Sequence, residues 1–190
     1  MKRTITGCLQ LIFAAALAVS LPAGAQQPKK TPRIGYVYLY NVGPSAPYIA
    51  PFRARMRELG WIEGTNIAIE YFDAGGNPDK LAAIMRQLVD SNVDLIVASC
   101  TPEAKAAQKV TSTIPIVFAA TGDPVKAGVV ASLGRPGGNA TGLAVQLLEL
   151  SGKRMELLKE VSPSLKRAAV LWNPVRPDNA PEVSAMQQSA

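Results

Sequence analysis

The sequence contains no histidine and only two cysteines, Cys8 and Cys100. The lack of histidine excludes a Ser-His-Asp triad, a Cys-His dyad and any metal site built on imidazole. Two cysteines are too few for a zinc knuckle or a disulfide scaffold. The net charge is +6, but charged residues are only 18% of the chain and the basic ones are dispersed among acidic ones. We therefore expect no binding to nucleic acid.

Nucleotide-binding loops are also missing, because neither G-x-G-x-x-G nor G-x-x-x-x-G-K-[ST] occurs. The glycine pairs Gly75-Gly76 and Gly137-Gly138 are typical of ordinary turns. Hydrophobic residues make up 48% of the 190 residues, which fits a folded globular protein. We expect neither a cofactor nor a metal.

The first 25 residues have the three parts of an export signal in order. A basic start is followed by an apolar run from Leu9 to Leu21, and Ala23-Gly24-Ala25 matches the A-x-A cleavage pattern. The run is too short for a membrane anchor, which needs about 20 residues. Cys8 precedes the run, whereas a lipid-modified cysteine would follow it. We expect cleavage before Gln26 and a lipid-free periplasmic protein.

Strand-like and helix-like segments alternate after a polar leader at 26–32. Apolar and aromatic runs predict strands at 33–39, 67–72, 94–99, 114–119 and 140–143. Apolar spacing and capping signals predict helices at 49–59, 78–89, 101–111 and 124–133. Short helices between strands indicate right-handed βαβ units, so the fold class is α/β with a parallel, doubly wound sheet.

A second unit begins after this lobe. Apolar residues predict a helix that ends before Pro163, a sixth strand at 167–172, and a last helix that opens at Pro181. One strand and two helices cannot cover both faces of a sheet. The expected domains are a signal peptide at 1–25, a leader at 26–32, an N-terminal α/β lobe at 33–143, and a crossover with the incomplete start of a second lobe at 144–190.

Polar side chains follow the first, third and fourth predicted strands. In an open α/β sheet the ligand crevice lies at the carboxyl ends of the strands, so these turns should converge. Helix N-termini there would attract a small anion or zwitterion. The predicted ligand-binding residues are Tyr40, Asn41, Ser45, Ser99, Cys100, Thr101, Thr121 and Asp123. Tyr38, Tyr40 and Tyr48 flank the first turn and are candidates for a ligand wall.

Three of these residues allow a second interpretation. Asp123 is either a catalytic carboxylate or the N-cap of a helix that begins at Pro124. Cys100 is either a nucleophile activated by a helix N-terminus or a small, half-buried residue. Thr101 is expected to serve as an N-cap, a role that competes with binding a ligand through its hydroxyl. An exported enzyme that uses Asp123 or Cys100 is therefore the alternative to a binding protein. The sensor domain of a receptor is a third possibility, which the lack of a long apolar segment after residue 25 disfavours.

Several stretches together resemble one family of transport proteins. They are RIG at 33–35, 53–64 with LGW and Gly64, IPIVF at 114–118, GDPV at 122–125, GVVASL at 128–133, RPGGNATG at 135–142 and GKRMELLKE at 152–160. The chain resembles the substrate-binding proteins of ABC transporters that are predicted to import amino acids and related small molecules, with the type I periplasmic binding fold.

The resemblance carries functional expectations of its own. It implies an exported binding component, not an enzyme, that captures an amino acid or similar small molecule between two lobes. The protein would then deliver the ligand to an ABC permease in the inner membrane, and we expect it to be a monomer. Family members run well beyond residue 190, so the resemblance also implies a truncated second lobe.

Overall fold

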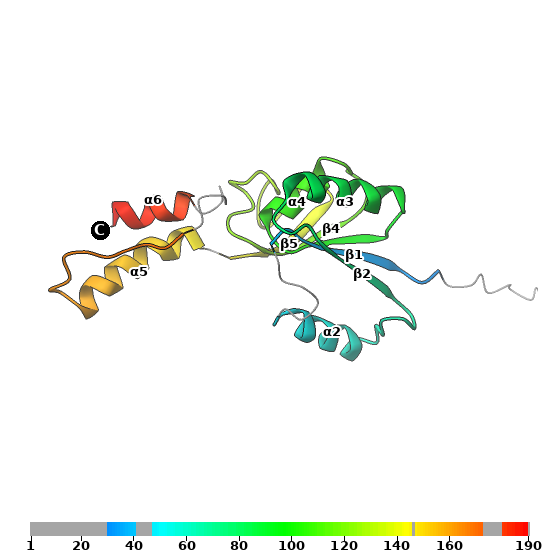
Figure 1. Ribbon diagram of the computed structural model, residues 1–190, viewed down its shortest axis with the longest axis horizontal. Coiled ribbons are helices and arrows are strands. Elements are labelled where there is room, and N and C mark those ends of the chain that lie inside the picture. Colours follow the sequence, from blue (N-terminus) through cyan, green and yellow to red (C-terminus); the bar gives the residue numbers. More distant parts are fainter. Residues whose placement is uncertain (1–29, 41–46, 146, 173–179, 190) are drawn as a thin grey trace, which may run out of the picture. The chain divides into compact units, whose positions relative to one another are not determined.

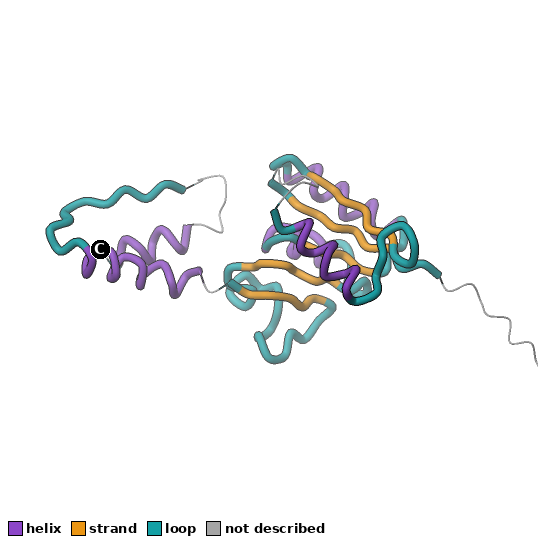
Figure 2. Tube along the Cα trace, turned by 90° about the horizontal axis from the view of Figure 1, so that it is seen from below, coloured by secondary structure: helices purple, strands orange, loops and turns teal. Residues whose placement is uncertain are grey.

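The computed structural model describes residues 30–40, 47–145, 147–172 and 180–189. Five strands form one sheet in the order β2-β1-β3-β4-β5, and every neighbouring pair is parallel. The strands are β1 (Arg33–Tyr38), β2 (Ala68–Asp73), β3 (Leu95–Ala98), β4 (Ile116–Thr121) and β5 (Ala140–Ala144). Figure 2 shows them side by side. The predicted α/β class and parallel sheet are confirmed, and β1, β3 and β4 are neighbours.

Helices cover the two faces of this sheet unequally. Helices α3 (Pro78–Asp90) and α4 (Thr101–Gln108) lie over one face, and α2 (Ile49–Glu58) lies on the other (Figure 1). This arrangement follows from the right-handed crossovers that join parallel strands. It leaves the carboxyl ends of the strands free of helix bodies and available to the connecting turns.

The core on the α3 and α4 face forms as the helical stripe predicts. Leu81, Ile84, Met85 and Leu88 of α3 are buried against the sheet. Asn77 caps the helix, since its side-chain oxygen accepts from the backbone N–H groups of the first turn, and Pro78 follows at the first helical position. The apolar stripe therefore begins at the turn after β2, as predicted.

One glycine on β1 is required by this packing. A Cβ at Gly35 would lie 2.5 Å from a terminal methyl carbon of Leu88. Only glycine lets α3 approach the centre of the sheet this closely.

The α2 face has a second, smaller core around β1. Tyr36, Tyr38 and Val97 are buried there, and Phe52 and Met56 of α2 pack against them. Cover decreases toward β5 on the same face, where Val117 is half-buried and Leu143 is 71% exposed. Helix α2 thus covers β1, β2 and β3 better than β4 and β5.

The predicted helix at 124–133 is wrong. The structure has a single turn there, in which Ala127 N–H donates to the Asp123 carbonyl at 2.9 Å. Gly128 then takes φ = 71° and ends the helical hydrogen bonding after that turn. Glycine adopts this left-handed conformation at no steric cost, so the apolar spacing further along the segment does not extend the helix.

The last part of the described chain holds α5 (Leu147–Val161) and α6 (Ala180–Gln188), which pack on each other. A Cβ at Gly152 would lie 2.9 Å from Ser189 Oγ, which shows how closely the end of α6 approaches α5. The predicted strand at 167–172 is wrong, because these residues have no ladder partner among the described residues and form an irregular segment. A strand requires a neighbour for its backbone hydrogen bonds.

None of the described helices has the length and apolar character needed to cross a membrane. The predicted signal peptide and leader up to residue 29 lie outside the described residues, and so do Asn41 and Ser45 of the predicted site.

Candidate functional site

The carboxyl ends of β1, β3 and β4 meet at one edge of the sheet. Ser99 N–H donates to the Val37 carbonyl at 3.0 Å, and Ala120 N–H donates to the Ser99 carbonyl at 3.1 Å. These two bonds join the last residues of three neighbouring strands. Cys100 and Thr121 therefore lie at the same edge, as predicted.

A buried carboxylate, Glu103, connects the turns at this edge. Its Oε1 accepts from Leu39 N–H at 2.6 Å and from the Ser99 hydroxyl at 2.7 Å, and its Oε2 accepts from Cys100 N–H at 3.2 Å. The side chain is only 1% exposed. It joins the end of β1, the end of β3 and the start of α4, so one residue fixes the spacing between two of the predicted ligand-contacting turns.

Cys100, not Thr101, is the N-cap of α4. Its backbone is extended, with φ = −143° and ψ = −171°, and Thr101 and Pro102 are the first two helical residues. The prediction that Thr101 is the N-cap is wrong by one position. Glu103 stands at the third helical position and accepts from the N-cap N–H, as in a capping box. Thr101 therefore has no cap role to compete with a ligand.

Thr121 ends β4 in a fully buried position. Its side chain is 0% exposed, and its hydroxyl oxygen is the only buried side-chain N or O atom without a hydrogen-bond partner among the described residues. A buried hydroxyl with no partner costs about 1–3 kcal/mol. The predicted site thus contains a polar group whose hydrogen bond is not made within the described residues.

Asp123 caps the turn that follows β4. Its Oδ1 accepts from Val125 N–H at 3.1 Å and from Lys126 N–H at 2.9 Å. Asp123 thus makes the hydrogen bonds expected of an N-cap, but it caps a single turn and not the predicted helix at 124–133. The other carboxylate oxygen lies 3.8 Å from the Lys126 ammonium, and both side chains are partly exposed.

Carboxylates of the protein itself bind the backbone N–H groups that were predicted from the sequence to bind a ligand anion. Glu103 occupies the N-terminus of α4, and Asp123 occupies the amide groups of the turn after β4. The helix dipole and these backbone donors are already neutralised by the chain itself. A ligand carboxylate would meet negative charge at both places.

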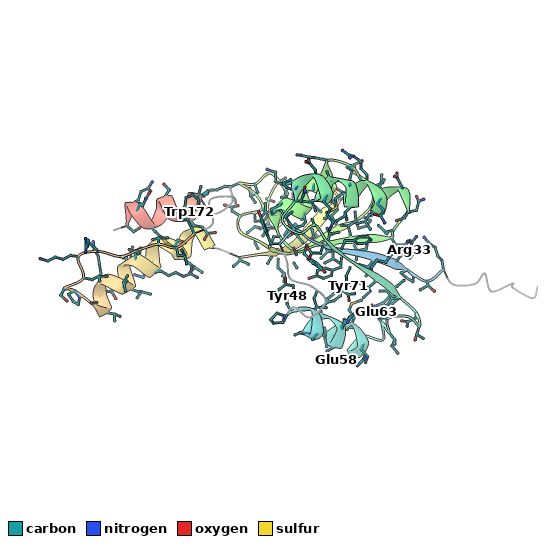
Figure 3. All side chains as sticks on the ribbon, viewed as in Figure 1. Arg33, Tyr48, Glu58, Glu63, Tyr71 and Trp172 are labelled. Carbon is teal, nitrogen blue, oxygen red and sulfur yellow. The ribbon has the colours of Figure 1, made fainter. Side chains whose placement is uncertain are left out.

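The tyrosines near the first turn lie in different environments. Tyr38 is 2% exposed and belongs to the α2-face core, whereas Tyr40 is half-buried against the core on the opposite face. Tyr48 is 44% exposed and stands at the start of α2 (Figure 3). Of these three candidates for a ligand wall, only Tyr48 lines the groove described next.

An apolar groove of about 480 Å³ runs from the strand ends along the α2 face of the sheet. Ser99 and Cys100 form its polar part, and Tyr36, Tyr48 and Phe52 provide aromatic surface. The Tyr36 and Phe52 rings meet edge to face with centroids 5.5 Å apart. A flat apolar or aromatic group would find complementary surface here.

The tyrosine hydroxyls of the groove stay neutral over a wide pH range. Burial raises the pKa of Tyr36 to about 12, with smaller contributions from neighbouring groups that include Tyr48 and Glu103. Burial and the nearby Cys100 and Glu103 side chains also raise the pKa of Tyr48. Neither hydroxyl adds negative charge to the groove at neutral pH.

A second hollow, of about 340 Å³, lies within the segment that contains α5 and α6. Its lining combines apolar residues such as Met155, Val170 and Trp172 with Lys159 and Arg167. Leu171, beside two of these residues, is fully exposed. This hollow lies in a unit whose apolar residues are incompletely buried, and it contains none of the predicted site residues.

These features are typical of α/β lobes that bind small molecules. The polar strand ends of this lobe lie at the carboxyl edge of a parallel sheet, where such folds bind ligands. The apolar groove starts there at Ser99 and Cys100 and runs along the α2 face as far as Ile34 and Leu95. Within the described part of the chain no group of His, Cys, Asp and Glu side chains could hold a metal ion.

Comparison with known proteins agrees with this class. The family model of the ABC transporter substrate binding proteins matches residues 50–190, and the chain belongs to this family. A curated relative, a tyrosine-binding protein from Clostridioides difficile, is 31% identical over 96% of this chain and 56% of its own length.

Solved structures extend the comparison to the fold. A conserved domain protein from Vibrio cholerae is 32% identical, with a TM-score of 0.74 over 84% of this chain and 53% of that one. A protein from Streptococcus pneumonia, solved in complex with L-Trp, is 24% identical, with a TM-score of 0.73 over 84% of this chain and 53% of its own. The predicted type I periplasmic binding fold is confirmed, and the chain spans about half the length of these relatives.

Sequence reasoning missed two residues of this site. Glu103 follows the N-cap by three positions, which is the spacing of a capping box, but the cap is a cysteine and not the usual serine or threonine. Tyr36 lies within the predicted strand at 33–39. Its place in the groove depends on where α2 lies, which no local pattern specifies.

Proposed function

We propose that this chain forms the first lobe of an exported solute-binding protein that captures an amino acid with an aromatic side chain and delivers it to an ABC permease in the inner membrane. The observation that carries the proposal is the apolar, tyrosine-lined groove that opens beside the polar strand ends. The likeness to a tyrosine-binding protein supports the same ligand class. Relatives in the family are binding proteins, which supports a role without catalysis.

The ligand's aromatic group fits this lobe better than its carboxylate does. The groove supplies aromatic and apolar surface, while Glu103 and Asp123 already occupy the backbone donors at the turns. The ligand's ammonium group suits the carbonyl groups and side-chain oxygens of the strand ends. Its carboxylate would then be bound by a second lobe, and the site would require both lobes for tight binding.

Because this lobe would bind only the aromatic and ammonium groups of the ligand, the affinity expected for the chain by itself is low. Micromolar binding requires about 8 kcal/mol and millimolar binding about 4 kcal/mol. A single open lobe buries one side of a ligand, so millimolar affinity is expected for residues 26–190. The relatives' greater length is consistent with closure by a second lobe.

Saturation-transfer NMR tests the ligand class at this affinity. The chain as exported, residues 26–190, is mixed with L-tyrosine, L-tryptophan or L-glutamate at millimolar concentration. We expect transfer to the aromatic ring protons and none to L-glutamate. Equal transfer to all three amino acids, or to none, would contradict the proposal. Spectra recorded over a day also test the enzyme alternative, because turnover would replace the ligand signals with product signals.

Two substitutions at the turns give a matched comparison. Thr101→Ala removes a hydroxyl from the turn after β3. Thr121→Ala acts indirectly, by altering the end of β4, because the Thr121 side chain is 0% exposed. Both variants should weaken binding more than they lower the melting temperature. Lys105 is exposed on α4, the helix that begins at Thr101, so Lys105→Ala should change neither ligand affinity nor melting temperature. If Lys105→Ala weakened binding as much as the threonine variants, general charge would explain binding better than these turns do.

Export is tested separately by the mass of the protein recovered from the periplasm. The proposal expects an N-terminus at Gln26 and no lipid. A mass that retains Met1, or that includes a diacylglyceryl group, would contradict it.

A further inference from the structure

We propose that Glu103 is a positioning residue, which holds the first and third strand ends at the spacing that the ligand site requires. The main observation is that a single, almost fully buried carboxylate accepts three hydrogen bonds from the turns that follow two different strands. Two of its donors are backbone N–H groups, of Leu39 and Cys100, which belong to turns that follow different strands.

The chemistry of the three donors explains why an acidic residue stands here. Leu39 N–H and Cys100 N–H can only donate, and the Ser99 hydroxyl also donates to this group. A carboxylate has two acceptor oxygens with about four lone-pair sites, so it can accept all three bonds. Such charge-assisted hydrogen bonds are shorter and stronger than neutral ones. The first turn of α4 also favours negative charge at this place.

Glu103 acts on the ligand only through other residues. Its 1% exposure leaves no surface that a ligand could touch. Ser99 and Cys100, which it holds, line the groove, and Leu39 precedes the turn that contains Tyr40. A change at Glu103 therefore alters the placement of groove residues without removing any ligand contact.

A conservative substitution separates this role from simple core packing. In Glu103→Gln the amide oxygen can still accept from Leu39 N–H and the Ser99 hydroxyl. The amide NH₂ then faces Cys100 N–H, so that two donors meet and the third bond is lost. We expect the Cys100 amide to exchange its hydrogen at least about tenfold faster than in the wild type, while the Leu39 amide remains protected. In Glu103→Ala both amides should exchange faster.

Met85→Ala provides the matched control. Met85 is fully buried on α3 in the core of the α3 and α4 face, makes no hydrogen bond through its side chain to the described part of the strand-end turns, and does not line the groove. This variant lowers the melting temperature by creating a cavity, and it should raise exchange throughout the sheet without singling out Leu39 or Cys100. If the two Glu103 variants gave the same exchange pattern as Met85→Ala, or left both amides as slow as in the wild type, the positioning role would be overturned.

The consequence for binding rests on the proposed function. L-tyrosine should bind Glu103→Gln about tenfold more weakly than it binds the wild type or Met85→Ala, as measured by NMR titration of residues 26–190. Wild-type-like binding by Glu103→Gln would overturn the link to the ligand. If the wild type itself bound no amino acid, the proposed function would fail, and the exchange pattern would still decide whether Glu103 holds the strand ends.

Discussion

The strands are joined by side-chain hydrogen bonds at both of their ends: partly exposed bonds at the amino ends (the amino edge) and buried bonds at the carboxyl ends (the carboxyl edge). At the amino edge Arg33 N–H donates to Asp94, and the Arg33 guanidinium contacts the Ser91 carbonyl and Glu70, with side chains about 40% exposed. At the carboxyl edge the joining residue is Glu103, which is 1% exposed. Both residues link neighbouring strands, but only one does so away from solvent.

The difference indicates where the structure is held precisely. An exposed ion pair is screened by water and salt and contributes little to stability. A buried charge is retained only when its hydrogen bonds are made, so it fixes the positions of its partners. The carboxyl edge also contains the buried Thr121 hydroxyl, which lowers stability because it has no hydrogen-bond partner among the described residues. The carboxyl edge thus contains two buried polar side chains, Glu103 and Thr121, whereas the polar side chains at the amino edge are partly exposed. Buried polar groups, one of which lowers stability, are consistent with a ligand site at the carboxyl edge.

The largest effect should come from removing the buried carboxylate. Glu103→Ala leaves two buried backbone donors and one hydroxyl without their acceptor, and we expect a loss of about 3–5 kcal/mol in the free energy of unfolding. Urea denaturation followed by circular dichroism measures it. A loss below 1 kcal/mol, as small as that of an exposed ion pair, would remove the contrast between the edges.

Alkaline pH should lower the free energy of unfolding through Tyr36, which is buried in the core under α2. The pKa of Tyr36 is about 12 in the folded protein and 10.0 in the unfolded chain, so unfolding releases a proton between these values. Stability is therefore fully present below pH 10 and falls as the pH rises through 12, by up to about 3 kcal/mol. Tyr36→Phe should flatten this dependence in pH-dependent urea melts. An unchanged slope in Tyr36→Phe would show that another group causes it.

The amino edge should respond much less. Arg33→Ala removes an exposed pair with Glu70 and one contact to a carbonyl, and a loss of about 1 kcal/mol or less is expected. The loss should shrink further in high salt, because surface charges are screened there. A loss equal to that of Glu103→Ala, or one that salt does not change, would contradict the comparison.

The smallest effect should have the opposite sign. Thr121→Val replaces the unpartnered hydroxyl with a methyl group of similar size, so stability should stay unchanged or rise by about 1 kcal/mol. Thr121→Ser, which keeps the hydroxyl and removes the methyl group, is the control and should lower stability. Marked destabilisation by Thr121→Val would mean that the hydroxyl has a structural partner.

Sequence reasoning predicted the sheet because its signals are local. Asn77 and Pro78 mark the start of α3, and the apolar spacing of α3 identifies its buried face. The parallel orientation of the strands follows from the alternation of strands and short helices, whereas the adjacency of the first, third and fourth strands was expected from the family resemblance. That alternation also placed Cys100 and Thr121 at one edge.

The sequence-based predictions were wrong or incomplete where the structure depends on residues far apart in the sequence or on a backbone conformation that composition does not reveal. Gly128 ends the turn after β4 through a positive φ that apolar spacing does not reveal. Residues 167–172 have the composition of a strand, but a strand also needs a neighbour. Glu103 is 64 residues from Leu39 in the sequence, so no local pattern could show that these two residues are bonded.

The most direct test of the account is a titration of the isotope-labelled chain, residues 26–190, with L-tyrosine, followed by the chemical shifts of its backbone amides. We expect the largest concentration-dependent shifts at Ser99, Cys100 and Thr121, and clearly smaller ones at Arg33 and Asp94, which flank the far end of the groove. Shifts confined to the amino edge or to α5 and α6 would contradict a ligand site at the carboxyl edge.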